Sequence, residues 1–164
     1  HLEDSSEAEI KNVCIEKGIE PKNPLNKGQL LDHLMSNLVE PKLIEPTFII
    51  DYPKVISPLA KAHRKNRGNL VERFELFIGG SEFANSFSEL NDPIDQRKRF
   101  EEQARLKAEG DVEAQPIDTQ FIEAMECGMP PTGGVGIGID RLTMLLTENR
   151  WIKDVILFPI LKSD

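Results

Sequence analysis

The residues whose types and spacing best suit chemistry lie near the C-terminus, in a glycine-rich stretch followed by an arginine. Four glycines occur within residues 133–138, and Asp140-Arg141 then begins an apolar run of helical character. Glycine inside a strand usually marks a place where a ligand or another backbone approaches closely. Gly136 and Gly138 would leave a flat shelf for a planar ring, with Arg141 stacked on the ring or near its charged tail. The alternative is a strand packed tightly under a helix, with Arg141 in a surface ion pair.

A second pattern places two glutamates on a predicted β-hairpin. The strand-like runs 71–78 and 81–88 are joined by Gly79-Gly80, and two glycines are a strong hairpin signal because glycine adopts the positive φ of primed turns. The turn predicts three cross-strand pairs: Ile78 with Ser81, Phe77 with Glu82, and Glu75 with Ala84. Glu75 and Glu82 then become diagonal neighbours on one face, roughly 7–8 Å apart at Cα.

The closeness of these two carboxylates has a chemical consequence. They repel each other unless a cation or a proton lies between them. Oxygen ligands on a rigid sheet suit Mg²⁺, which often takes one or two carboxylates and completes its shell with water and phosphate. Glu75 and Glu82 are therefore candidate metal ligands. The alternatives are two solvated glutamates, or one glutamate paired with Arg73.

Alternation along the hairpin predicts which of its faces is buried. We expect the core face to carry the large apolar side chains, namely Phe74, Leu76, Ile78 and Phe83. Strict alternation would also put Asn85, Phe87 and Glu89 on the face opposite Glu82. If these residues share one site with Glu82, the strand must contain a β-bulge between Glu82 and Asn85.

Several stretches together resemble the catalytic domain of class II lysyl-tRNA synthetases. The glycine-rich strand followed by Gly138-Ile139-Asp140-Arg141 and an apolar helix is similar to the third signature motif of class II synthetases. The stretch from Glu82 to Pro93 resembles a sequence specific to the lysine branch. Ser57-Pro58-Leu59-Ala60 and the apolar run 154–159 also resemble the family. The resemblance covers about Thr47 to Lys162 and is weaker before it.

The resemblance implies roles for individual residues. The family's Mg²⁺-binding glutamates match Glu75 and Glu82, and Arg141 matches a catalytic arginine that stacks on the adenine. The residues that would bind ATP are Glu75, Glu82, Gly136, Gly138 and Arg141. The residues that would bind lysine are Asn85, Phe87 and Glu89. Glu89 would pair with the lysine ammonium ion, whose burial without a carboxylate costs several kcal/mol. Asn85 would hold the α-amino or the carboxyl end, and Phe87 would pack along the methylenes.

The implied reaction has two steps. Lysine and ATP form lysyl-adenylate and pyrophosphate, and the lysyl group then passes to lysine tRNA. The implied protein is a cytoplasmic homodimer, although an organellar location stays open. Nothing in the chain resembles the first two class II motifs, so we expect this chain alone to be inactive. Two alternatives remain: a paralogue that attaches lysine to a protein such as elongation factor P, and a non-catalytic lysine- or nucleotide-binding remnant.

Composition limits the remaining possibilities. The 164 residues are 39% hydrophobic and 29% charged, which is typical of a soluble globular protein. The formal net charge of −8 argues against a stand-alone nucleic-acid binder, which needs a basic face. Cys14 and Cys127 have no metal-binding spacing and suggest a reducing compartment. The chain begins at His1 without an initiator methionine, so we expect it to be part of a longer protein.

The elements that must position these residues predict an α+β fold, with an antiparallel sheet flanked by helices. Residues 1–45 are expected to form a helical insertion segment with two packed helices. Residues 46–164 are expected to form the C-terminal part of the catalytic domain, including the third motif. Asp92 and Asp118 are predicted N-caps of helices that run to about Ala108 and to Glu126.

Overall fold

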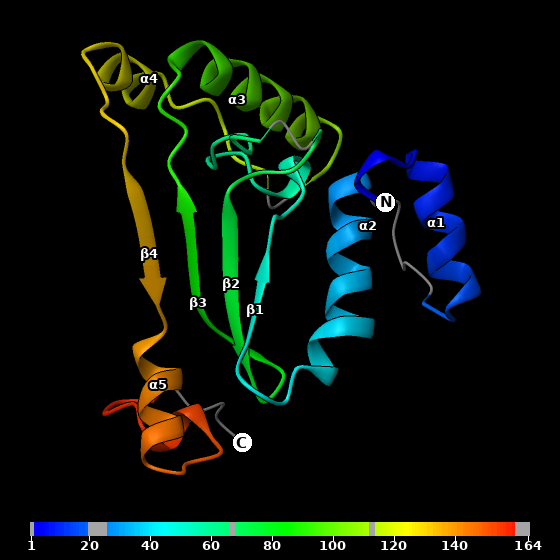
Figure 1. Cartoon of the computed structure of the whole chain (residues 1–164), viewed down its shortest axis with the longest axis vertical. Helices are drawn as coiled ribbons and strands as arrows, with labels where there is room; N and C mark the ends of the chain where they lie inside the picture. Colours follow the sequence, from blue (N-terminus) through cyan, green and yellow to red (C-terminus); the bar gives the residue numbers. More distant parts are fainter. Residues whose placement is uncertain (1, 20–25, 66–67, 112–113, 160–164) are drawn as a thin grey trace.

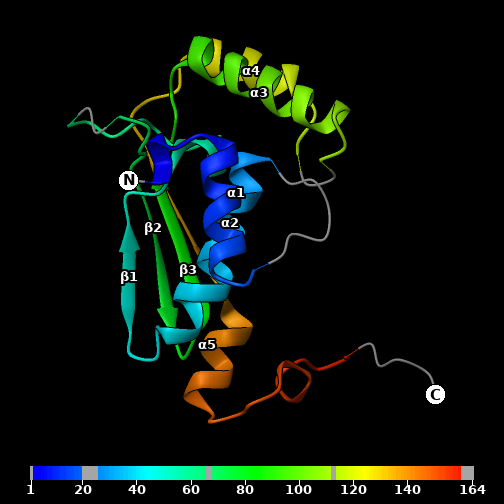
Figure 2. The same ribbon diagram turned by 90° about the vertical axis from the view of Figure 1, so that its right-hand side faces the viewer.

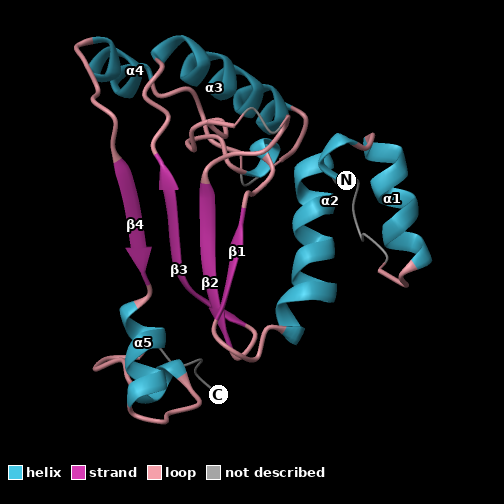
Figure 3. Ribbon diagram, in the orientation of Figure 1, coloured by secondary structure: helices cyan, strands magenta, loops and turns pink. Residues whose placement is uncertain are grey.

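The computed structural model describes residues 2–19, 26–65, 68–111 and 114–159. Its centre is an antiparallel sheet in the order β1-β2-β3-β4 (Figure 1). The strands are β1 (Thr47–Ile50), β2 (Arg73–Ile78), β3 (Ser81–Ser88) and β4 (Gly133–Ile137). The helices, drawn in cyan in Figure 3, are α1 (Glu7–Glu16), α2 (Lys27–Leu34), α3 (Pro93–Ala108), α4 (Thr119–Glu126) and α5 (Ile139–Leu146). The predicted α+β architecture, an antiparallel sheet flanked by helices, is confirmed.

The hairpin of β2 and β3 contains the predicted turn and the predicted bulge. Gly79 and Gly80 have φ of 59° and 75°, which L-residues with side chains rarely adopt. The pairs Ile78 with Ser81 and Phe77 with Glu82 form as expected, but Leu76 then pairs with Ala84. Phe83 is therefore the extra residue of a β-bulge. The expected pair of Glu75 with Ala84 is wrong by one residue, because the bulge moves Asn85 opposite Glu75.

The prediction for the buried face of the hairpin is wrong. Glu75 and Phe77 are buried, whereas Phe74, Leu76 and Ile78 are only half-buried. In Figure 2, α1 and α2 lie on one side of the sheet, and residues of α2 and of the turn after it approach Glu75 and Phe77. Apolar side chains therefore do not identify the covered face here, because part of the apolar surface stays uncovered by the described residues.

Helices α1 to α4 each begin after a residue whose side chain caps them, and the predicted caps Asp92 and Asp118 are confirmed. Ser6 caps α1, Asn26 caps α2, Asp92 caps α3 and Asp118 caps α4, each accepting a backbone hydrogen bond with its side chain. The first two also form capping boxes with Glu9 and Gln29, which satisfy two otherwise unpaired N–H groups at each helix start. The residues after α2 continue as a π-helical turn, Met35–Val39.

The α1–α2 pair has a core of its own. Its fully buried side chains include Ile10, Cys14 and Leu30, and burying a side chain such as Ile10 or Leu30 stabilises the fold by about 1.5–3 kcal/mol. A second core cluster, formed by Tyr52, Ala60 and Val71, lies beside the sheet. The separate core agrees with a helical segment before residue 46, although the boundary itself stays a prediction.

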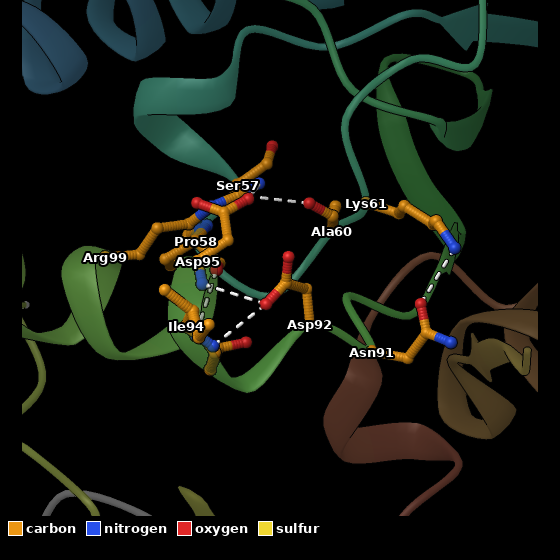
Figure 4. A network of polar contacts seen from close by, with 10 residues as sticks. Ser57, Pro58, Ala60, Lys61, Asn91, Asp92, Ile94, Asp95 and Arg99 are labelled. Carbon is orange, nitrogen blue, oxygen red and sulfur yellow. Dashed lines mark hydrogen bonds and ion pairs between the residues drawn. The ribbon is translucent and has the colours of Figure 1, made fainter. Parts of the chain in front are cut away.

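Helix α3 holds the loop that resembles the family's Ser-Pro-Leu-Ala stretch. The buried Arg99 donates hydrogen bonds to the backbone oxygens of Ser57 and Ala60, at 3.3 and 2.7 Å, and pairs with Asp95 at 2.7 Å (Figure 4). Gln96 donates to the carbonyl oxygen of Pro58 at 3.2 Å. These contacts fix the loop against the helix.

None of the helices in the described part of the chain is long and apolar enough to cross a membrane.

Candidate functional site

The bulge at Phe83 gathers most of the predicted site residues on one face of the sheet. Paired residues in a sheet share a face, and so do residues two apart on a strand. Two cross-strand rows therefore lie on the same face as the Phe77–Glu82 pair. They consist of Glu75, Asn85 and Gly136 in one row and of Arg73, Phe87 and Gly134 in the next. Strict alternation would have placed Asn85 and Phe87 on the face opposite Glu82. The extra residue, Phe83, places them on the same face instead.

Glu75, Glu82 and Arg141 line one cavity of about 390 Å³. Arg141 comes from the first turn of α5, and its Nη1 donates a short hydrogen bond to the backbone oxygen of Glu82. The same atom lies 3.9 Å from Glu82 Oε2. The side chains of Arg141 and Glu82 are 49% and 42% exposed, so both can reach a ligand in the cavity. Two carboxylates and an arginine at one cavity can contact a polyphosphate and its cation.

Glu75 is held from two sides. Its Oε2 accepts a hydrogen bond of 2.7 Å from the hydroxyl of Tyr52, and its Oε1 pairs closely with Arg73 Nη2. Burial, together with the hydrogen bond to Glu75, raises the pKa of Tyr52, which therefore keeps its proton and remains a donor. The alternative considered for the sequence, a glutamate paired with Arg73, is what the structure contains. Glu75 still lines the cavity despite these partners.

The three residues expected to bind lysine differ in their surroundings. Asn85 Oδ1 accepts a hydrogen bond of 3.1 Å from Arg73 Nε. Phe87 packs against the core cluster of Tyr52, Ala60 and Val71. The carboxylate of Glu89 lies so close to Gly134 that a Cβ there would collide with Glu89 Oε1. Burial raises the pKa of Glu89.

Glu89 is distinctive because no described residue balances its charge. Among the described residues, no side chain forms a hydrogen bond or an ion pair with its carboxylate. A partly buried carboxylate without a partner loses solvation without compensation. A cationic ligand would supply the missing charge. This is the chemistry required at the end of a lysine side chain.

Gly136 of β4 and Gly138, which follows the strand, leave open space beside these residues. Neither has a positive φ, so backbone conformation does not require glycine at either position. A Cβ at Gly136 would meet only the backbone oxygen of Asn85 at 3.8 Å, and one at Gly138 would meet that of Phe83 at 3.6 Å. Both are ordinary van der Waals contacts. Packing of the described residues therefore does not require glycine at these positions, which favours the ligand shelf over the tightly packed strand.

The glutamates fit Mg²⁺ only with help from a ligand. Within the described ranges, no group of three or more His, Cys, Asp or Glu side chains could hold a metal ion. Glu75 and Glu82 alone supply two carboxylates, which is the number that Mg²⁺ commonly takes when phosphates and water complete its shell. Each carboxylate oxygen has two lone pairs, so Glu75 can bind a cation while Tyr52 and Arg73 hold it.

The sequence did not predict three residues of the site. Asp32 and Glu40, from the segment given no chemistry, line the cavity with Glu75 and Glu82. Burial, and then the carboxylates of Asp32, Glu75 and Glu82, raise the pKa of Glu40 against the effect of a hydrogen bond from Ser36. Helical periodicity could not reveal this, since it says nothing about how a helix packs on a sheet. Tyr52, which donates to Glu75, gave only the weak signal of its closeness in sequence to a strand.

Comparison with known proteins gives a consistent answer. The family described as tRNA synthetases class II (D, K and N) matches residues 5–162. A lysine–tRNA ligase of Porphyromonas gingivalis is 54% identical over 159 residues, which are 97% of this chain and 27% of that protein. A lysine–tRNA ligase of a Nostoc species is 64% identical over 137 residues, and one of Gloeobacter violaceus is 58% identical over 147 residues. These cover 84% and 90% of this chain, and 24% and 29% of those proteins.

The chain thus spans about a quarter of the length of these relatives. The match of the family covers nearly every described residue, including the α1–α2 segment before the sheet. The described fold, an antiparallel sheet flanked by helices and bearing the glycine strand before Arg141, agrees with that assignment. The chain belongs to the class II tRNA synthetases of the aspartate, lysine and asparagine group.

Proposed function

We propose that this chain forms part of the active site of a lysine–tRNA ligase, in a longer protein that activates lysine with ATP and transfers it to lysine tRNA. The observation that carries the proposal is the single sheet face that joins two kinds of site. At one end lies a cavity lined by Glu75, Glu82 and Arg141. Farther along, the carboxylate of Glu89 lies above Gly134 and has no partner among the side chains that the structure describes. The names of the relatives support tRNA, rather than a protein, as the acceptor.

The site residues would divide the work between the two substrates. Glu89 would pair with the lysine ammonium ion, Phe87 would border the methylenes, and Asn85 would contact the α-carbon end. Gly136 and Gly138 would leave space for the adenine ring, and Arg141 would lie against the ring with its charge near the phosphates. Mg²⁺, held by Glu75 and Glu82 together with the nucleotide, would neutralise phosphate charge. The whole enzyme would be a homodimer.

The chemistry would depend on positioning and charge rather than on a general base. The lysine carboxylate is already a nucleophile and attacks the α-phosphorus of ATP, with pyrophosphate as the leaving group. In the second step, a ribose hydroxyl at the 3′ end of the tRNA attacks the acyl carbon and AMP leaves. Arg141 would stabilise the negative charge that develops at phosphorus, and removal of one such donor typically costs 10²–10³-fold in rate.

Lysine-dependent exchange between ATP and pyrophosphate, measured on the full-length protein, tests the proposal. We expect exchange with lysine but not with aspartate or asparagine. Arg141→Ala should lower the exchange rate about 10²-fold while leaving the thermal unfolding midpoint unchanged, because the side chain is about half exposed. Exchange that depends on aspartate or asparagine, or full activity in Arg141→Ala, would contradict the assignment.

A further inference from the structure

The guanidinium of Arg73 connects the two halves of the proposed site. Its Nε donates to Asn85 Oδ1 at 3.1 Å, and its Nη2 pairs closely with Glu75 Oε1. Asn85 and Glu75 are cross-strand partners, and one side chain therefore fixes a residue of the lysine end and a residue of the nucleotide end. Arg73 is not among the residues proposed to contact lysine. Any effect of Arg73 on lysine binding must therefore act through another side chain.

Arg73 is itself held rigidly. Its Nη1 donates hydrogen bonds of 2.9 Å to the backbone oxygen of Ile56 and to Ser57 Oγ, and its guanidinium carbon lies 4.7 Å from the centre of the Tyr52 ring. The loop at Ser57 is fixed in turn by the buried Arg99 of α3. Only 16% of the Arg73 side chain is exposed. A planar group with this many directed contacts has one orientation available to it.

The chemistry of the guanidinium determines how Asn85 is oriented. Arginine carries only donors, so Asn85 must present its amide oxygen to Arg73 Nε. The Nδ2 group then remains available as a donor, because none of the described residues accepts a hydrogen bond from it. Asn85 is thereby set as a donor, which suits an oxygen of the lysine carboxylate and does not suit the α-ammonium group.

We propose that Arg73 is a positioning residue for lysine, which orients the Asn85 amide toward the substrate carboxylate while it holds Glu75 in the adjoining cavity. This inference rests on the proposed function. Without the Arg73 guanidinium, the Asn85 amide would no longer be held in position, and the substrate carboxylate would lose its hydrogen bond from Asn85 Nδ2. The substitution Arg73→Lys would keep a positive charge beside Glu75 but could not make all of these contacts at once.

The test is a double-mutant cycle on the full-length protein, with the dissociation constant for lysine measured by titration calorimetry without nucleotide or metal. Arg73→Lys is expected to weaken lysine binding about tenfold. In an Asn85→Ala background the same change should weaken it less than about threefold, because the residue through which Arg73 acts is gone. Equal effects in both backgrounds would mean that Arg73 is merely structural, and an unchanged constant in Arg73→Lys would also overturn the proposal.

Two further variants keep the test decisive. If Arg73→Lys does not fold, Ser57→Ala is the substitute, because it removes only one acceptor that holds Arg73. Ser57→Ala should weaken lysine binding in the unmodified protein and should weaken it less in the Asn85→Ala background. Arg64→Lys is the matched control, because Arg64 pairs with Glu72 at the surface and should leave lysine binding unchanged. Absence of lysine binding by the unmodified protein would refute the proposed function, whereas binding with independent effects refutes only the role of Arg73.

Discussion

Glu89 combines a cost to the folded protein with a role in the proposed site. Its carboxylate is partly buried above Gly134 and has no partner among the described side chains. By contrast, Glu75 is more deeply buried but is satisfied by Tyr52 and Arg73. The comparison separates two kinds of acidic residue on one face: Glu75, whose charge is balanced by Arg73, and Glu89, whose charge no described side chain balances.

Glu89→Gln should therefore discriminate between the two substrates. Without its carboxylate the lysine ammonium would be unpaired, and we expect lysine binding to weaken by about 3 kcal/mol, the lower end of the range for breaking a buried pair. ATP binding should change little, since Glu89 does not line the cavity of Glu75, Glu82 and Arg141. Michaelis constants for both substrates in pyrophosphate exchange provide the measurement, and equal losses for lysine and ATP would argue against this role.

The same substitution should also have a pH-dependent effect on stability. Because burial raises the pKa of Glu89, the ionised form is less favourable in the folded protein than in the unfolded chain. Glu89 therefore opposes folding above its folded-state pKa, and this cost disappears as the pH falls through that value. Glu89→Gln should raise the thermal unfolding midpoint at pH 7 in the absence of lysine, and the gain should shrink on acidification. A gain that grows on acidification would contradict the assigned sign.

At the scale of the elements, β4 is the strand whose composition is least explained by its own packing. Glycine in a strand interior costs stability relative to a residue with a side chain, and Gly133 and Gly136 have room for a Cβ. The two positions differ in the face they occupy. Gly136 belongs to the row of Glu75 and Asn85, whereas Gly133 pairs with Ser88 on the opposite face.

This difference provides a matched pair of variants. Gly136→Val should raise the Michaelis constant for ATP at least tenfold by placing a branched side chain on the shelf, while the protein stays folded. Gly133→Val should leave the constant for ATP unchanged, because its side chain would lie on the other face. Circular dichroism and pyrophosphate exchange of both full-length variants check the expectation. Normal ATP use by Gly136→Val would show that the glycines serve some other purpose.

The sequence predicted local features well and long-range relations poorly. Capping residues located the starts of α3 and α4, and Gly79-Gly80 located the turn, because these signals act over a few residues. The need for a bulge followed from requiring Glu82 and Asn85 to share a site. The buried face of β2 was misassigned, because the side of the sheet on which α1 and α2 lie is set by tertiary packing. The hold of Arg73 on Asn85 could not be foreseen, since it needs the shifted register.

At the scale of the molecule, one face of the sheet carries an uncovered apolar surface. Phe48, Ile50, Val135 and Ile137 are 55–64% exposed, and their cross-strand partners place them all on the face opposite Glu75. Figure 2 shows β1 with α1 and α2 on its other side. Exposed apolar patches of this kind mark surfaces that bind protein or that promote association.

The 164-residue chain by itself should not activate lysine. It spans about a quarter of the length of its relatives, and from the sequence we expect it to lack the first two class II motifs and the phosphate-binding arginine of the second. Loss of such a preorganised charge typically costs about 2.7–4 kcal/mol of barrier. The exposed sheet face should also make the purified chain self-associate. Pyrophosphate exchange and light scattering test both points, and exchange well above background would show that the chain holds a complete site.

Because of the bulge at Phe83, the face on which each site residue of β3 lies depends on the number of residues in the hairpin. Glu82 and Asn85 are three positions apart in the sequence, an odd number that ordinarily separates two side chains to opposite sides of a strand. Because Phe83 has no cross-strand partner, Glu82 and Asn85 lie on the same face of the sheet. Deleting one residue between Glu82 and Asn85 would therefore move the side chains beyond the deletion to the opposite face of the sheet. Deleting two residues would shorten the strand but keep those side chains on their present face.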